Sequence, residues 1–311
     1  MGKVSDNTYY GRADDTILVT QRLRGDVLLI IHRFFSAQGF VYIDPPILHE
    51  QVQGKKHEVY LPLHDNRYSL NSSNALYMGA YAALLGNVYA ISPTFRDEQD
   101  SVNHLVEFRM LEAEVLDMTY SELPDFVENL IKYVLKELLY SSFVRSRKFL
   151  SERIDNLQTT FHPRRITFEA FIRELEYSGD TKLTQDTDLS DIDYEISKYI
   201  QEPVFIMDYP RSLATWTAKP KNVVDAFAIN LMLPDAFGEL CEGCERTNDT
   251  NLLRYKMRCA GIENLQWYLN AVSQITAPRC GFGIGVDRLL RWIAGVPHIA
   301  DCVLFPRIKR E

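Results

Sequence analysis

Apolar residues along the chain follow two spacings, one typical of helices and the other typical of strands. Between residues 17 and 38 they recur at helical spacing, so this segment is predicted to be a helix that ends at Gly39. The next residues, 40–43, are aromatic or β-branched and predict a strand, which the two prolines that follow bring to an end. The helical stripe consists of Ile17, Leu23, Val27, Ile30, Ile31, Phe34 and Phe35.

The middle of the first half combines a strand pattern with charged residues. Residues 94–98 and 105–116 predict two strands joined by a short polar connection. Side chains along the second strand alternate with a period of two, so Phe108, Glu112 and Glu114 share one face and the opposite face is mainly apolar. Because buried carboxylates are costly without partners, this face favours a binding site over a solvated surface.

The remaining elements decide the fold class. Helices are predicted over 72–85, 124–140, 194–200 and 262–272, and strands over 88–92, 204–207, 226–233 and 237–241. The segment 281–293 begins glycine-rich and continues as an amphipathic helix. Strands come in groups and do not alternate regularly with helices. This grouping favours an α+β fold, with a mainly antiparallel sheet flanked by helices, over a doubly wound fold.

One main domain is expected over residues 17–311, because the chain has no internal repeat, low-complexity run or long linker. Residues 1–16 are polar and are expected to form an N-terminal tail. Residues 145–200 alternate basic and acidic groups, and we interpret them as an insertion region within that domain.

Composition and charge narrow the function classes. The 311 residues carry 42 acidic and 34 basic side chains, a formal net charge of −8. This balance disfavours a non-specific nucleic-acid binder, since phosphate neutralisation needs a surplus of Lys and Arg. The longest apolar runs are too short for a bilayer, and residues 1–15 lack the apolar core of a signal peptide. Together with only five cysteines, these features predict a cytoplasmic globular enzyme without membrane association or a disulfide framework.

Three segments carry motifs that are informative in combination. They are GFVYIDPPIL at 39–48, TFRDE at 94–98 followed by HLVEF at 104–108, and GFGIGVDRL at 281–289, with FPR at 305–307. Over residues 17–308 the chain resembles the catalytic domain of class II aminoacyl-tRNA synthetases of the asparaginyl/aspartyl subgroup. The resemblance implies the α+β class II fold, ATP and Mg²⁺ as cofactors, and a homodimer that forms through the region of the first motif.

The resemblance also assigns roles to residues. Arg96 is suited to the α-phosphate and the reacting carboxylate, because a guanidinium is a bidentate donor. By the same resemblance, His104 and Arg288 would bind the β- and γ-phosphates, and Phe108 would stack on adenine. Gly285 would let the backbone approach the nucleotide closely, and Glu239 would be a magnesium ligand. Glu98, Glu112 and Glu114 would bind the substrate ammonium or the adenine edge.

Each of these residue types also has an ordinary structural interpretation. A strand arginine beside a glutamate often forms a structural ion pair, Phe108 would by itself be a core residue, and His104 would by itself be a turn residue. The three motifs in order favour the site interpretation.

Several departures from the subgroup bear on function. In full-length members an anticodon-binding barrel precedes the catalytic domain, whereas here the first-motif helix starts within about twenty residues of Met1. Asn103 stands where an arginine commonly precedes the histidine, in a connection that approaches tRNA in the family. We therefore expect a stand-alone catalytic domain that does not charge tRNA.

The amino-acid pocket departs further. Arg246 matches the arginine that binds the side-chain carboxylate or amide of Asp or Asn, whereas Met78 replaces a lysine of aspartyl enzymes. Ser73 and Met78 are candidate substrate contacts in the same segment. Cys244 and Asn230 stand where serine and a second metal-binding aspartate are usual. We interpret the nucleotide-binding core as retained and the amino-acid pocket as altered.

The leading functional hypothesis is an ammonia-dependent asparagine synthetase, a type of stand-alone domain known in this lineage. Aspartate would bind reversed, with its β-carboxylate near Arg96 and its α-carboxylate at Arg246. The alternatives are an amide ligase that uses another amine or a carrier, and a non-catalytic ligand sensor. A zinc site at Cys241 and Cys244 is a weaker hypothesis, because no second Cys-x-x-Cys follows.

Overall fold

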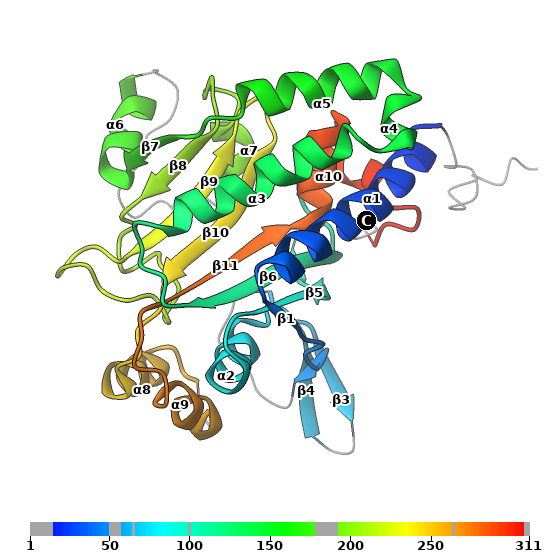
Figure 1. The fold of residues 1–311 in the computed structure, drawn as a ribbon. Helices are drawn as coiled ribbons and strands as arrows, with labels where there is room; N and C mark the ends of the chain where they lie inside the picture. The colour runs from blue at the N-terminus through cyan, green and yellow to red at the C-terminus, as the bar shows by residue number, and fades with distance from the viewer. Residues whose placement is uncertain are drawn as a thin grey trace, which may run out of the picture.

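The computed structural model describes residues 15–49, 57–63, 66–98, 101–177, 192–262 and 265–307. An eight-stranded sheet runs through its centre (Figure 1). In sheet order the strands are β1 (Val41–Tyr42), β5 (Val88–Phe95), β6 (Glu107–Leu116), β11 (Arg279–Gly285), β10 (Gly238–Glu245), β9 (Ala228–Leu233), β8 (Val204–Met207) and β7 (Arg164–Thr167). A smaller sheet consists of β2 (Leu48–His49), β4 (Asn66–Leu70) and β3 (Tyr60–Leu63).

Neighbouring strands of the large sheet are antiparallel except at its two edges, where β1 runs parallel to β5 and β7 runs parallel to β8. The expected α+β fold with a mainly antiparallel sheet flanked by helices is therefore confirmed. The helices are α1 (Asp15–Ala37), α2 (Ala75–Leu85), α3 (Leu123–Leu138), α4 (Ser142–Arg145), α5 (Lys148–Thr160), α6 (Phe168–Tyr177), α7 (Asp193–Ile196), α8 (Thr250–Cys259), α9 (Gln266–Val272), α10 (Val286–Ala294) and the 3₁₀ helix η3 (Ile299–Cys302).

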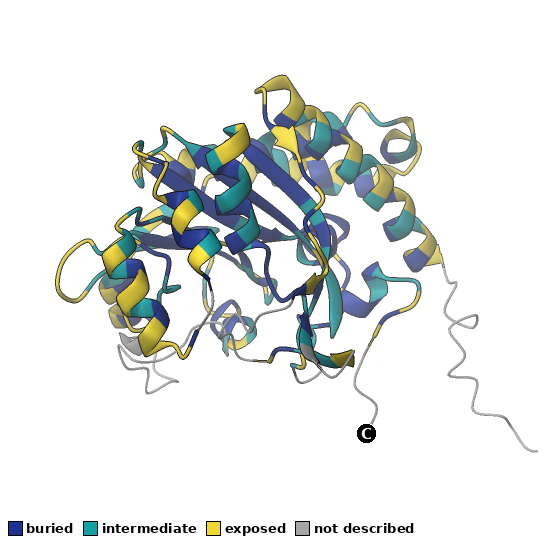
Figure 2. Ribbon diagram, turned by 90° about the horizontal axis from the view of Figure 1, so that it is seen from below, coloured by how far each residue is buried: buried dark blue, intermediate teal, exposed yellow. Residues whose placement is uncertain are grey.

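Helices α1, α3, α5 and α10 pack with one another against one face of the sheet (Figure 1). Their apolar sides and the sheet form the largest buried cluster, and exposed residues gather on the outward sides of the helices (Figure 2). Helices α2 and α9 pack together near one end of the sheet, and α7 packs on β10. These short elements frame the face of the sheet that carries the charged residues.

Helix α1 forms where the apolar stripe predicts it. Ile17, Val27 and Phe35 are buried, while Leu29 on the other side is exposed. Gly39 has a φ of +76°, a conformation that favours glycine, and follows the end of the helix.

The predicted hairpin is present, with Thr94 opposite Phe108. Its faces are also as predicted, because Leu111, Ala113 and Val115 enter the large apolar cluster and the two glutamates between them face the other way. The prediction of two separate strands at 88–92 and 94–98 is wrong. A single strand, β5, covers Val88–Phe95, so residues 96–98 lie past its end.

Pro93 lies within β5 without breaking it. Its carbonyl accepts a hydrogen bond from Asn71 Nδ2 at 2.8 Å, on the side of β5 away from β6. Because the N and C=O of one strand residue point to the same side, the missing N–H of proline costs no bond to β6.

Other boundaries differ from the predictions. The helix expected over 194–200 is the single turn α7, and the helix expected over 262–272 begins at Gln266 as α9. The glycine-rich start of 281–293 is strand β11, because its small residues pair on both sides with β6 and β10. Residues 145–200 also contribute the edge strand β7. The expected tail, except residues 15 and 16, lies outside the described residues.

In the part of the chain that the structure describes, no helix has the length and apolar character needed to cross a membrane.

Candidate active site

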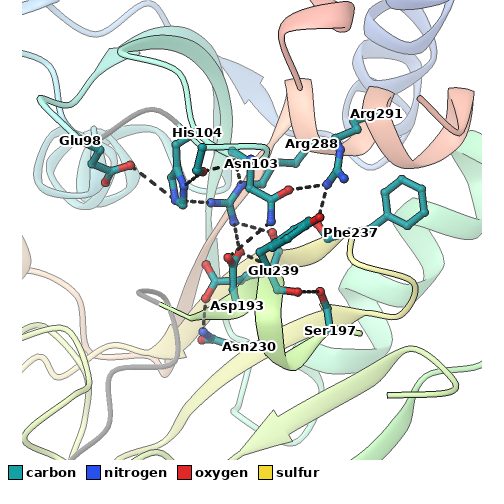
Figure 3. Close-up of polar contacts among 12 residues, drawn as sticks. Glu98, Asn103, His104, Asp193, Ser197, Asn230, Phe237, Glu239, Arg288 and Arg291 are labelled. Atoms are coloured by element: carbon teal, nitrogen blue, oxygen red, sulfur yellow. Dashed lines mark hydrogen bonds and ion pairs between the residues drawn. The ribbon is translucent and has the colours of Figure 1, made fainter. Parts of the chain in front are cut away.

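Arg288, in the first turn of α10, extends its guanidinium toward three other segments, which are β10, α7 and the β5–β6 connection (Figure 3). Its Nη1 donates to the carbonyl of Glu239 at 2.6 Å and to Oδ2 of Asp193 at 3.1 Å. Its Nε donates to the carbonyl of Asn103 at 3.3 Å, and its Nη2 lies 2.9 Å from Nε2 of His104. A guanidinium has five N–H donors, so these contacts leave one on Nη2 for a ligand.

His104 is held on both ring nitrogens. Nδ1 lies 2.6 Å from Ser101 Oγ, and Nε2 faces Arg288 and lies 3.6 Å from Glu98 Oε2. Burial lowers the pKa of His104, and the nearby Arg288 guanidinium lowers it further. The neutral ring then accepts from Arg288 at Nε2 and carries its proton at Nδ1, toward Ser101.

Arg96 lies immediately after β5, beside Phe108 on β6. Its guanidinium carbon is 5.5 Å from the centre of the Phe108 ring, and its Nε donates to the carbonyl of Ser72 at 3.4 Å. Its Nη1 lies 3.6 Å from Oε1 of Glu98, which is the ion pair considered above as a structural alternative. The structure therefore brings Arg96, Glu98, His104 and Phe108 together around the start of the β5–β6 connection. Gln99 and Asp100 of this connection lie outside the described residues.

Glu239 and Asn230 lie on the adjacent strands β10 and β9, where Asn230 Nδ2 donates to Glu239 Oε2 (Figure 3). Burial and, to a smaller extent, the Glu242 carboxylate together raise the pKa of Glu239 to about 8. A bound cation would offset the negative charge of the ionised Glu239 carboxylate. Magnesium binds through one or two carboxylates together with substrate phosphates, so Glu239 and the amide oxygen of Asn230 fit an ion that arrives with ATP.

The two cysteines of the Cys-x-x-Cys sequence do not form a shared metal site. Cys241 packs in the large apolar cluster beneath the helices, whereas Cys244 packs in a second cluster beside β8. Burial raises the pKa of Cys244 to about 11, which disfavours the thiolate that zinc requires. Within the described ranges, no group of three or more His, Cys, Asp or Glu side chains is placed to hold a metal.

Glu114 lies on β6 between two guanidiniums. Arg279 donates from Nη1 to Oε1 of Glu114, and both side chains are fully buried. Arg279 is also held by Asn248 Oδ1 at 2.7 Å and by the Tyr268 hydroxyl at 3.2 Å. On the other side, Nε of Arg246 lies 3.5 Å from Oε2 of Glu114.

On the side of this cluster toward Arg246, two polar atoms make no hydrogen bond to the described residues, although Glu114 Oε2 stays in its ion pair with Arg246 Nε. Arg246 donates from Nη1 to Thr217 Oγ1 at 2.8 Å and Cys244 Sγ at 3.1 Å, but among the described residues its Nη2 has no acceptor. Glu114 Oε2 accepts no hydrogen bond there either. A Cβ at Gly281 would collide with both of these atoms, so they lie side by side against the same stretch of bare backbone. The backbone at Gly281 therefore has beside it one hydrogen-bond donor, Arg246 Nη2, next to one acceptor, Glu114 Oε2.

The Glu112 carboxylate accepts hydrogen bonds from residues at the N-terminus of α2. It accepts from Ser73 Oγ at 2.7 Å, from the Asn74 backbone at 2.9 Å and from Asn74 Nδ2 at 2.9 Å. Met78, one turn into α2, is 1% exposed and packs in an apolar cluster with Ile43 and Val88. Substrate contacts by Ser73, Glu112 and Met78 remain predictions.

Gly285 ends β11 immediately before α10. The three atoms nearest to a Cβ there would all belong to the Arg288 side chain, at the ordinary contact distance of 3.5 Å. The expected need for glycine near the nucleotide remains a prediction at this position.

Two residues of the site were not identified from the sequence. Asp193 belongs to the acidic residues of the region 145–200, of which Asp186, Asp188 and Asp191 lie outside the described residues. No local pattern could have found it, because it is 95 positions from Arg288. Arg279 had a usable signal, since an arginine in a strand of small and apolar residues requires a buried partner.

Comparison with known proteins decides the family. The model for tRNA synthetases class II (D, K and N) matches residues 10–309. The chain belongs to this family. Its members share a catalytic domain that uses ATP and Mg²⁺ to activate an amino acid as an aminoacyl adenylate, so this chain carries the corresponding ATP-dependent, AMP-forming ligase domain.

Solved structures of synthetases resemble this class II domain. Asparaginyl-tRNA synthetase from Pyrococcus horikoshii, complexed with asparaginyl-adenylate, is 25% identical with a TM-score of 0.84, and the match covers 94% of this chain and 69% of that one. The Entamoeba histolytica asparaginyl-tRNA synthetase is 21% identical with a TM-score of 0.86, and the match covers 99% of this chain and 72% of that one. A putative aspartyl-tRNA synthetase from Leishmania major Friedlin is 19% identical with a TM-score of 0.76, and the match covers 95% of this chain and 66% of that one. The last two, below 25% identity, support the fold alone.

The raised pKa of Glu239 predicts a pH dependence of stability. Its carboxyl ionises near pH 4.5 in the unfolded chain but near pH 8 in the folded protein without Mg²⁺. The unfolded state therefore binds fewer protons between these values, and the free energy of unfolding falls as pH rises through this window. Glu239→Gln should remove this part of the fall, on the order of a few kcal/mol. Urea unfolding at pH 5, 6.5 and 8 measures it.

The exposed Glu152 provides the matched control for this experiment, because its side chain is 66% exposed. Glu152→Gln should keep the wild-type pH dependence. Identical pH dependence in wild type and Glu239→Gln would contradict the prediction.

Proposed function

We propose that this protein is an ATP-dependent ligase that activates the β-carboxylate of aspartate and transfers it to ammonia, forming asparagine, AMP and pyrophosphate. The supporting observation is the adjacent donor and acceptor formed by Arg246 Nη2 and Glu114 Oε2. The head of an α-amino acid carries a carboxylate and an ammonium on one carbon, which match these two atoms. In this proposal the head of aspartate is held there, and its β-carboxylate is the group that is activated at Arg96.

The residues around Arg96 suit the activation step. A β-carboxylate oxygen attacks the α-phosphorus of ATP, the bond to the β-phosphate oxygen breaks, and pyrophosphate leaves. Arg96, oriented by Glu98, offsets negative charge at the reacting oxygens. Arg288 holds the β- and γ-phosphates through its remaining N–H, His104 accepts from Arg288 and orients it, and Phe108 stacks on adenine. Glu239 would hold magnesium, which would supply charge stabilisation on the phosphates.

The transfer step releases AMP. The nitrogen of ammonia attacks the β-acyl carbon, the bond from that carbon to the AMP oxygen breaks, and a proton is lost from nitrogen. No tRNA takes part in this proposal.

Product analysis tests the proposal. Incubation with aspartate, ammonium chloride and Mg·ATP should form asparagine and AMP in equal amounts, and added tRNA should not be charged. Arg96→Ala should lower the rate at least ~100-fold, since it removes transition-state charge stabilisation. Asparagine formation no greater than with Arg96→Ala would overturn the proposal.

A second candidate function follows from the same pair of atoms. A carboxamide also presents an acceptor and a donor at one end, so asparagine fits Arg246 and Glu114 through its side chain and would be activated at its α-carboxylate. The Pyrococcus enzyme described above binds asparaginyl-adenylate. Pyrophosphate exchange that depends on asparagine and not on aspartate would favour this candidate, whose acceptor is another amine or a carrier.

Arg246 should control affinity for the amino acid and not for ATP. Arg246→Lys keeps the charge but replaces the planar group that reaches Thr217 and Glu114 together, so the KM for aspartate should rise about 10- to 100-fold with little change in the KM for ATP. Exchange kinetics measure both constants. Arg254→Lys, on the exposed side of α8, is the control. A rise in the KM for ATP alone would contradict this role.

The proposed active form is a homodimer that pairs through α1 and β1. This surface exposes Leu18, Leu29, Val41 and Tyr42, and beside it is a cavity of about 370 Å³ lined by Arg24, Leu28, His32, Tyr42, Ile91 and Arg109.

Sedimentation velocity tests the dimer. Leu29→Asp should weaken dimerisation at least about tenfold, because it places a charge in an apolar interface. Leu84→Asp, at an exposed position on α2, should not change it. A wild-type protein that stays monomeric at micromolar concentration would disprove the dimer.

A further inference from the structure

Asp193 reaches the Arg288 end of the site from α7, a one-turn helix within residues 145–200, the region interpreted above as an insertion. We infer that Asp193 is a positioning residue for ATP, which acts by fixing the Arg288 guanidinium before the nucleotide binds. The contact is direct, because Arg288 Nη1 donates to Asp193 Oδ2 at 3.1 Å (Figure 3). Asp193 is 2% exposed, so solvent does not weaken this pair as it weakens a surface ion pair.

The Asp193 carboxylate is itself fixed by other donors. The backbone N–H of Glu239 donates to Oδ2 at 3.0 Å, and Asn103 Nδ2 donates to Oδ1 at 3.4 Å. A Cβ at Gly238 would lie 2.6 Å from Oδ2, so the carboxylate packs closely on the start of β10. Phosphate could displace Asp193 only by leaving these buried donors without an acceptor, which is costly. Asp193 is therefore part of the fixed framework and does not block the phosphate site.

Asn103 connects this framework to a second arginine. Arg291, one turn after Arg288 on α10, donates from Nη1 to the side-chain oxygen of Asn103. Arg291 Nη2 also donates to the carbonyls of Ala236 at 3.0 Å and Pro297 at 2.9 Å. Asn103 is 1% exposed, and all the polar atoms of its side chain and its carbonyl have partners. The β5–β6 connection is thus attached to α7 and α10 together.

The functional consequence is a preordered phosphate contact. An arginine side chain loses rotamer freedom when it binds a ligand, and this loss lowers affinity. With Arg288 held by Asp193, Glu239 and Asn103, that freedom is already lost in the folded protein, and the remaining N–H on Nη2 is directed by the framework. Removal of the Asp193 charge should therefore weaken ATP binding only when Arg288 is present.

A double-mutant cycle tests this coupling. Isothermal titration calorimetry would measure the Kd of the non-hydrolysable analogue Mg·AMPPNP for wild type, Asp193→Asn, Arg288→Ala and the double variant. Asp193→Asn should raise the Kd about tenfold in the wild-type background and less than twofold in the Arg288→Ala background. An additive effect, no change, or tighter binding by Asp193→Asn would overturn the inference. Tighter binding would show that Asp193 competes with phosphate.

Two further variants keep the result interpretable. Glu195→Gln removes the same charge from the same helix, where Glu195 pairs with Lys198 at the surface, and should leave the Kd unchanged. Asn103→Ala removes the amide that supports Asp193 but keeps the carbonyl that Arg288 contacts. It should raise the Kd about threefold, again only with Arg288 present. If Asp193→Asn fails to fold, the cycle with Asn103→Ala decides, and additivity there overturns the inference. Because the readout is binding of an ATP analogue, it is independent of which amino acid is activated.

Discussion

The pairing of buried charge on one face of the central sheet determines what this site can bind. Glu114 and Arg279 are both removed from water, and each is tolerable only because the other is present. The opposite face of β6 packs into the apolar cluster beneath α1 and α3, so the strand cannot rotate these charges into solvent without exposing its core residues. The strand pairing of β6 with β11 thus fixes the position of Glu114 beside Arg246.

The two ends of the site differ in how fully their polar atoms are satisfied. At the ATP end, Arg288, Asp193 and Asn103 have nearly all of their hydrogen bonds within the protein. At the proposed amino-acid end, Glu114 Oε2 accepts no hydrogen bond and Arg246 Nη2 donates none within the described residues. Where the hydrogen bonds are already made within the protein, the side chains are rigid and select ligands by geometry. Where polar atoms lack hydrogen bonds, only a ligand with matching donors and acceptors binds well.

The sequence predicted the local features well and the distant contacts poorly. Helix α1, the two faces of β6 and the grouping of Arg96, His104 and Phe108 follow from periodicity and motifs within short segments. The end of β5 at Phe95 does not, because strand ends depend on how far the partner strand extends. The contact between Asp193 and Arg288 joins segments far apart in the chain, and only the assembled sheet brings them together.

Gly281 has a consequence for how the proposed amino-acid site could change its specificity. Because Gly281 has no side chain, one atom each of Glu114 and Arg246 fits beside it. Even alanine at this position would have to displace one of these charged side chains. The size of the site therefore cannot be adjusted gradually by substitutions at this position. Divergence toward a different amino acid would have to proceed through the partners of Arg246, such as Thr217 and Cys244, whose replacement redirects the guanidinium and leaves the backbone unchanged.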